Sequence, residues 1–152
     1  MSDSPLFETM VDFFKSDDWP YIQLEDRPVL SLNYNGKHAN WTCYAQAREE
    51  QQQVIFYSVC PVTAPAERRA ALAEFITRAN YGLIIGNFEL DFEDGEIRYK
   101  TSLDAEDVVL TPTIFKNVVY ANLSMMDKYL PGLMSILYSE VTPRAMIDQI
   151  EN

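Results

Sequence analysis

The sequence predicts an α+β protein in which helices pack on an antiparallel sheet of about five strands. Two observations carry this prediction. Apolar residues recur at helical spacing in some segments and alternate with a period of two in others. Short turns join neighbouring alternating segments, which is how antiparallel strands are connected. The predicted order is one helix, three or four strands, a helix, two strands and a final helix, α-β(3-4)-α-β-β-α.

Length and composition fit one domain over residues 1–152. Of the 152 residues, 47% are hydrophobic, enough to form a core without disulfides or metals. The formal net charge of −11 argues against nucleic acid and anionic membrane as main partners. No apolar run approaches the ~20 residues of a membrane-spanning helix, and the first residues are acidic, so we expect a cytoplasmic protein. Cys43 and Cys60 lie in strand-like runs and are expected to be buried thiols.

Three helix starts are marked by a hydroxyl residue followed by proline. The hydroxyl can cap the helix, and proline in the first turn loses no hydrogen bond. These pairs stand at Ser4-Pro5, Thr111-Pro112 and Thr142-Pro143. The apolar spacing after the first pair predicts a short amphipathic helix that ends near residues 15–18.

Alternation from Tyr21 to Cys60 predicts three or four antiparallel strands. The runs are 21–24, 29–34, 41–45 and 54–60. Asn35-Gly36 follows the second run, and both residues tolerate positive φ, so we expect a tight hairpin turn there.

The second half begins with a helix from Pro65 to a left-handed cap at Gly82. A hairpin of 88–92 and 97–100 follows, turning at Asp94-Gly95, with one face in water. Residues 112–138 form one long helical pattern, and a tail helix covers 144–150. Pro131 is expected to kink or end the long helix, and the sequence leaves open which.

The long helix has an apolar arc of ~200°, about twice the width needed to pack on a sheet alone. A second subunit, the tail helix folded back, or a client or ligand could cover the excess. We expect a homodimer. The residues predicted to form the dimer or partner interface are Phe115, Val119, Met126, Leu130 and Leu133.

Candidate chemistry is sparse, and the sequence predicts no catalytic, cofactor-binding or metal-ligating residue. The single histidine, His38, is expected in a solvated turn, because no triad or metal-site partners surround it. Residues Asn87 to Asp107 hold eight carboxylates, but their spacing does not fit a calcium loop. A solvated hairpin face or a docking surface for a basic partner both remain open for this stretch.

Four stretches of the second half carry a family resemblance. They are Ala79-Asn80-Tyr81-Gly82-Leu83, Gly86-Asn87-Phe88-Glu89-Leu90-Asp91, Asp94-Gly95-Glu96-Ile97-Arg98-Tyr99, and Tyr120-Ala121-Asn122 with Met126-Asp127-Lys128-Tyr129. In this order they resemble the YbjN-like domain family, particularly its cyanobacterial members, over nearly the whole chain. The resemblance implies a fold like that of type III secretion chaperones, which are small acidic bacterial proteins of the cytosol that dimerise and hold partner polypeptides. It also implies a role in regulating sensory transduction, without enzymatic chemistry.

Two hypotheses from different classes follow. The first is a non-enzymatic dimeric binding protein, a chaperone or adaptor that holds a polypeptide by hydrophobic contact or strand addition. The alternative is a small-ligand sensor or unrecognised enzyme, with a pocket between sheet and helices lined by tyrosine, tryptophan and Cys43 or Cys60.

Overall fold

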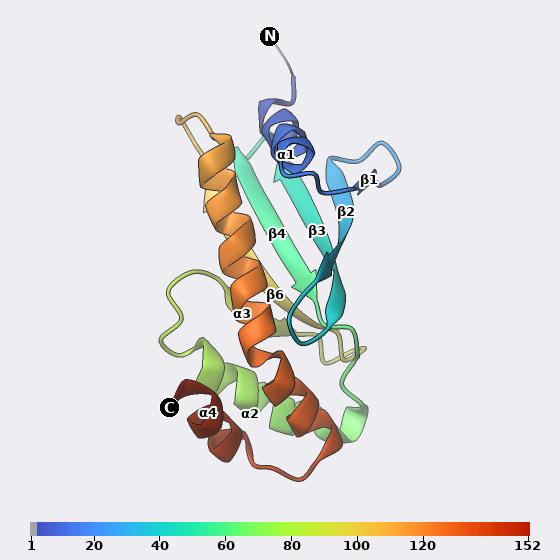
Figure 1. Ribbon diagram of the computed structural model, residues 1–152, viewed down its shortest axis with the longest axis vertical. Helices are drawn as coiled ribbons and strands as arrows, with labels where there is room; N and C mark the ends of the chain where they lie inside the picture. The colour runs from blue at the N-terminus through green and yellow to red at the C-terminus, as the bar shows by residue number, and fades with distance from the viewer. Residues whose placement is uncertain (1–2) are drawn as a thin grey trace.

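A six-stranded antiparallel sheet organises the chain, and helices lie against one of its faces (Figure 1). The computed structural model describes residues 3–152. Its elements are α1 (Pro5–Ser16), β1 (Ile22–Gln23), β2 (Val29–Asn35), β3 (Asn40–Arg48), β4 (Gln53–Val59), the 3₁₀ turn η1 (Ala66–Arg68), α2 (Arg69–Asn80), β5 (Asn87–Leu90), β6 (Ile97–Asp104), α3 (Pro112–Tyr138) and α4 (Pro143–Glu151). The predicted α+β class and element order are confirmed, with four strands before α2 and six strands rather than five.

The strand order across the sheet is β1-β2-β3-β4-β6-β5. Alternation within the strands divides the sheet into two faces. The inner face lies under α1 and α3, and its residues on β3 and β4 are at most 3% exposed: Trp41, Cys43, Ala45, Val54 and Phe56. None of the described helices covers the opposite face, which we call the open face. Its central residues are all half-buried: Thr42, Tyr44, Gln46, Ile55, Tyr57, Val59, Arg98 and Lys100.

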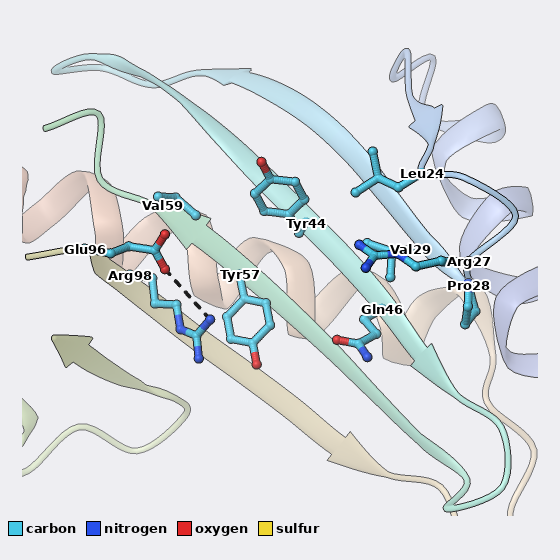
Figure 2. A pocket seen from close by; sticks show the side chains of 10 residues that line it. All are labelled: Leu24, Arg27, Pro28, Val29, Tyr44, Gln46, Tyr57, Val59, Glu96 and Arg98. Atoms are coloured by element: carbon cyan, nitrogen blue, oxygen red, sulfur yellow. Dashed lines mark ion pairs between the residues drawn. The ribbon is translucent and has the colours of Figure 1, made fainter. Parts of the chain in front are cut away.

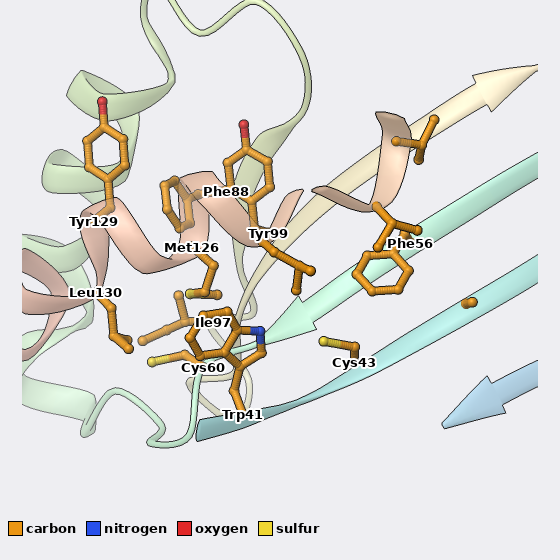
Figure 3. Close-up of a cluster of buried hydrophobic side chains, with 14 of the residues drawn as sticks. Trp41, Cys43, Phe56, Cys60, Phe88, Ile97, Tyr99, Met126, Tyr129 and Leu130 are labelled. Atoms are coloured by element: carbon orange, nitrogen blue, oxygen red, sulfur yellow. The ribbon is translucent and has the colours of Figure 1, made fainter. Parts of the chain in front are cut away.

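Aromatic rings fill the layer between the sheet and the helices. Phe14 of α1 packs against Phe115 of α3, with ring centroids 5.7 Å apart, in an edge-to-face arrangement. Further along the layer, Phe88 packs edge-on against Tyr99 at 4.7 Å and against Tyr129 at 5.5 Å (Figure 3). The helices are therefore held to the sheet by interlocking rings along its length.

Asn122 interrupts the apolar arc of α3 and is completely buried. Its side-chain Nδ2 donates to the carbonyls of Phe56 and Tyr99, at 2.8 and 3.0 Å, and lies 3.2 Å from Oγ1 of Thr101. Phe56 is on β4 and Tyr99 on β6, so one side chain fixes α3 to two neighbouring strands.

Helix α3 runs without interruption from Pro112 to Tyr138, so Pro131 does not end it. Its last turns lie at an angle to the earlier ones (Figure 1). A Cβ at Gly132 would collide with the side chains of Phe75 and Ile150. The glycine after the proline therefore lets α2 and α4 pack closely against this part of α3.

The predicted dimer or partner interface on α3 is wrong. Phe115, Val119, Met126, Leu130 and Leu133 are each at most 1% exposed within one chain. Within the chain itself, the prediction counted only the sheet and the tail helix as possible cover. In the structure, α1 also lies along α3, and both α2 and α4 pack against its C-terminal half (Figure 1). These five side chains belong to the core and form no surface for a partner.

The turn between β2 and β3 also differs from the prediction. Asn35 is still paired in the ladder, and the Gly36 N–H donates to the Ala39 carbonyl at 2.8 Å. The two central residues of the turn are therefore Lys37 and His38, rather than Asn35-Gly36. The positive-φ glycines of the described chain do not include Gly36.

Contacts with the rest of the fold explain this turn. A Cβ at Gly36 would collide with the Trp41 ring, so glycine is needed there for space. The Asp127 carboxylate of α3 accepts hydrogen bonds from the N–H groups of Lys37 and His38, at 2.8 and 3.0 Å. The turn is therefore shaped by a helix about 90 residues away in sequence.

Two of the three predicted hydroxyl caps are confirmed. Thr111 and Thr142 each accept a hydrogen bond from the backbone N–H three residues on, at 3.1 and 3.2 Å. Ser4 makes no side-chain cap bond to α1. The N–H groups of the second and third residues of that helix instead donate to the carboxylate of Glu49, at 3.2 and 2.8 Å.

Candidate functional site

The strand register lays out the open face in rows that cross the sheet. One row consists of Ser31, Tyr44, Tyr57, Lys100 and Asn87, on five successive strands. The next row consists of Asn33, Thr42, Val59, Arg98 and Glu89. Directly opposed side chains on antiparallel strands lie ~4.5–5.5 Å apart at Cβ, so each row is a line of touching neighbours.

Two tyrosines occupy the centre of the open face. Tyr44 of β3 stands directly opposite Tyr57 of β4. The guanidinium of Arg98 lies over the Tyr57 ring, with Cζ 4.1 Å from the ring centroid. This distance is within the ~6 Å range of a cation–π contact. Figure 2 shows both rings and Arg98 on the side of the sheet away from α3.

The cations on this face are held by carboxylates. Arg98 Nε donates to Glu89 at 2.7 Å, and Lys100 Nζ donates to the other Glu89 oxygen at 3.1 Å. Partial burial alone would raise the pKa of Glu89, but these hydrogen bonds and charges outweigh it and hold the pKa below its ordinary value. Glu96 lies 3.9 Å from Arg98 as a second, looser partner (Figure 2).

A broad, open hollow of about 540 Å³ lies beside the two tyrosines. Its lining residues come from β2, β3, β4, β6 and the segments just before β2 and β6: Leu24, Arg27, Pro28, Val29, Tyr44, Gln46, Tyr57, Val59, Glu96 and Arg98. It mixes aromatic and aliphatic surface with two guanidinium groups, and it can hold side chains of a partner without chemistry of its own.

The sheet ends in β5 on one side and in β1, a strand of only two residues, on the other. On β5, the Phe88 N–H donates to Asn80 Oδ1 at 2.7 Å, and the Phe88 carbonyl accepts from Asn80 Nδ2 at 3.1 Å. On β2, the Asn33 carbonyl accepts from Trp19 Nε1 at 2.9 Å. An added strand needs free backbone groups at an edge, so the Asn80 bonds obstruct strand addition at β5, and the shortness of β1 disfavours it on the other side.

The two cysteines are buried in the core, as predicted, and do not line the ligand pocket of the alternative hypothesis. Cys43 and Cys60 are free thiols, both buried, on the helix side of the sheet (Figure 3). Burial raises the pKa of Cys43 to about 12 and that of Cys60 to about 11. Neither thiol is poised to react, and the layer around them is filled by side chains.

The acidic stretch uses several carboxylates to shape turns. Asp91, Asp94 and Asp104 each accept a hydrogen bond from the backbone N–H two residues on, at 2.8 to 2.9 Å. Such bonds stabilise turns between or after strands. Within residues 3–152, no group of three or more histidine, cysteine, aspartate or glutamate side chains is placed to hold a metal.

His38 is exposed in the β2–β3 turn, as predicted, and it also has a partner. Its Nδ1 lies 2.9 Å from the Asp127 carbonyl and 3.1 Å from the Asp127 carboxylate. Partial burial would raise the pKa of Asp127, but the N–H groups of Lys37 and His38 and the His38 ring hold the pKa below its ordinary value. This cluster fastens the β2–β3 turn to α3.

Sequence reasoning missed the open face. Its signal was present: tyrosines occupy positions 44 and 57, where a fully wet face would carry polar residues. Which face the helices cover depends on how distant elements pack, so the alternation alone could not show that this side is free.

The fold is shared with solved structures. YbjN from E. coli matches with a TM-score of 0.66 at 12% identity, over 86% of this chain and 91% of that one. The ExsC–ExsE complex matches with a TM-score of 0.60 at 13% identity, over 84% and 92%. The Yersinia pestis type III secretion chaperone SycH, in complex with a stable fragment of YscM2, matches with a TM-score of 0.52 at 14% identity, over 86% and 98%. The predicted chaperone-like fold is confirmed.

The curated proteins and the search for membrane spans give negative results. No curated protein gives a significant match to the chain. Nothing in the matches points to cyanobacterial members in particular. Among the helices of residues 3–152, none is both long and apolar enough to cross a membrane.

A family model matches most of the chain. The YbjN model, described as "Putative bacterial sensory transduction regulator", matches residues 7–134. This match spans all six strands and most of α3, the elements that form the sheet and its inner layer. The chain therefore belongs to the YbjN family.

Proposed function

We propose that the chain is a non-enzymatic binding protein, a chaperone or adaptor that holds a polypeptide segment on its open face. The observation that carries this proposal is the set of half-buried tyrosine, isoleucine and valine side chains on a sheet face without a helix. The fold neighbours support it, because ExsC and SycH were solved in complexes, SycH with a fragment of YscM2.

The physical chemistry of the face favours a protein partner. Tyrosine offers a large contact area with few rotatable bonds, and it is enriched at interfaces together with arginine. Tyr57 and Arg98 are already stacked on each other, and Glu89 holds Arg98 in place. Little side-chain entropy is therefore lost on this side of the interface when a partner covers them.

The setting of this activity is part of the proposal. Because the family is described as a regulator of sensory transduction, we place the binding activity in that process. Two free cysteine thiols are compatible with the reducing cytoplasm. We also propose that residues 1–152 act as one domain, and a core that extends from Leu6 in α1 to Ile147 in α4 supports this.

We also propose that the chain forms a homodimer, through a surface other than the one predicted on α3. The loop between α2 and β5 exposes large apolar side chains: Tyr81 is 89% exposed, Ile84 is 92% and Ile85 is 53%. Such a cluster is favourable to cover. Sedimentation velocity at micromolar concentration should give a dimer, and Ile84→Ser should return it to a 17.5 kDa monomer. A monomeric wild-type chain would remove the dimer from the proposal.

Photo-crosslinking tests the binding function directly. A photoreactive phenylalanine replaces Tyr57 in the full chain, and in a matched control it replaces Lys116, which is exposed on α3. After irradiation in cells of the source organism, position 57 should form discrete adducts with a polypeptide, and position 116 should form none. Adducts at both positions alike, or none at position 57, would refute the proposal.

A further inference from the structure

We infer that the segment held on the open face is an amphipathic helix with acidic residues beside its apolar stripe. This inference rests on the proposed function and specifies the partner. Three features of the described chain carry it: the edges of the sheet, the width of the apolar track, and the distribution of charge.

The edges of the sheet argue against an extended partner. Strand addition draws its affinity from backbone hydrogen bonds along an edge strand. Asn80 occupies both backbone groups of Phe88 on the edge strand β5, and the other edge strand, β1, has only two residues. A segment that docks on the face cannot pair its own backbone with the sheet, because those groups already bond within the ladder. Its backbone hydrogen bonds must be internal, as they are in a helix.

The width of the apolar track fits one helix. The track lies on the two central strands, with Tyr44 on β3 and Ile55, Tyr57 and Val59 on β4. Strands lie ~4.8 Å apart, so two of them present a track about 10 Å wide. This is about the diameter of an α-helix with its side chains. The same two strands already carry α1 and α3 on their inner face (Figure 1).

The open face is close to neutral, whereas the rest of the chain is strongly acidic. The hollows along the track contain four basic and four acidic residues: Arg27, Arg48, Arg98 and Lys100, and Glu89, Asp91, Glu96 and Asp104. The rest of the chain then carries 8 basic and 19 acidic residues of the 12 and 23 present. A partner with carboxylates beside its stripe is therefore repelled elsewhere on the chain but not here, where Arg27 and Arg48 lie beside the track.

Selection from a random library of displayed 20-residue peptides tests the inference. The full chain is the target, and peptides that still bind a Tyr57→Thr variant are removed. Threonine keeps the strand preference, and thermal unfolding checks that the variant is folded. We expect the remaining peptides to repeat apolar residues at i, i+3, i+4 and i+7, with aspartate or glutamate next to them, and to become helical when bound.

The outcomes separate the inference from the proposed function. Selected peptides with alternating apolar residues, or with basic flanks, would overturn the helix inference and leave polypeptide binding in place. The absence of any peptide that depends on Tyr57 would contradict the proposed function itself. A wild-type dimer that Tyr57→Thr dissociates would show that a second copy occupies the face, and this would also overturn the inference.

Two charge reversals, one beside the hollow and one on α3, test the role of charge. Arg27 is exposed beside the hollow, and Arg27→Glu should weaken the selected peptides by about three- to tenfold, with a smaller effect at high salt. Lys116→Glu makes the same change in net charge on α3 and should leave affinity within about twofold. Equal effects of the two substitutions would contradict the local role of charge.

Discussion

The guanidinium of Arg98 lies over the ring of Tyr57, with its Cζ 4.1 Å from the ring centroid. The contact links β6 to β4 on the face of the sheet that carries no helix. It orders an aromatic ring and a cation on a surface where both are only half-buried. The proposed binding surface is therefore arranged before any partner arrives.

The first prediction concerns this contact. A double-mutant cycle of Tyr57→Leu and Arg98→Gln, measured by urea unfolding, should give a coupling free energy of about 0.5–1 kcal/mol. A parallel cycle of Tyr44→Leu with Arg98→Gln serves as the control, because Arg98 stacks on Tyr57 and not on Tyr44. Equal coupling in the two cycles would show that the stacking adds nothing.

The second prediction concerns the buried amide of α3. Asn122→Ala removes the donors to the Phe56 and Tyr99 carbonyls, which stay buried between helix and sheet. The free energy of unfolding should fall by about 2–4 kcal/mol, because buried carbonyls lose their partners and a cavity forms. Asn117→Ala, at an exposed position of the same helix, should change it by less than about 0.5 kcal/mol. A small effect at both positions would contradict the role of Asn122 in fixing α3 to β4 and β6.

The third prediction concerns pH. The folded-state pKa of Asp127 lies below its ordinary value of 3.8. Its carboxylate therefore stabilises the fold at pH values above 3.8, and this contribution disappears as the pH falls through the folded-state pKa. Asp127→Asn should be less stable at pH 7 and should lose less stability between about pH 5 and pH 2. Asp12→Asn, at an exposed position of α1, is the control and should keep the wild-type slope.

The fourth prediction concerns the closed edge of β5. Asn80→Ala frees the N–H and the carbonyl of Phe88, which lie on an edge strand. Free edge groups promote pairing between chains. Light scattering at increasing concentration should therefore show larger assemblies for Asn80→Ala than for Asn117→Ala. Identical scattering from the two variants would mean that Asn80 does not protect the edge.

Much of the fold followed from local patterns in the sequence. The alternating runs became β1 to β6, and the threonine–proline pairs became the caps of α3 and α4. These features depend on residues within a few positions of one another. The β2–β3 turn did not follow, because Asp127 and the Trp41 ring, both outside the turn, determine its shape.

The prediction of an interface on α3 was wrong for a related reason. Periodicity measures how wide an apolar arc is, but it does not say how many elements will cover it. Phe115 and Leu133 are buried because α1, α2 and α4 all reach the same helix. The open face was missed in the same way, because Tyr44 and Tyr57 reveal their role only once the helices are known to lie on the other side.

Side-chain footprinting with hydroxyl radicals tests most directly which surface binds the partner. The full chain is labelled alone and with a peptide from the selection bound. We expect the labelling of Tyr44 and Tyr57 to fall on binding, and that of Tyr138, which is 69% exposed at the end of α3, to stay unchanged. Unchanged labelling of both open-face tyrosines, with protection elsewhere, would contradict the account.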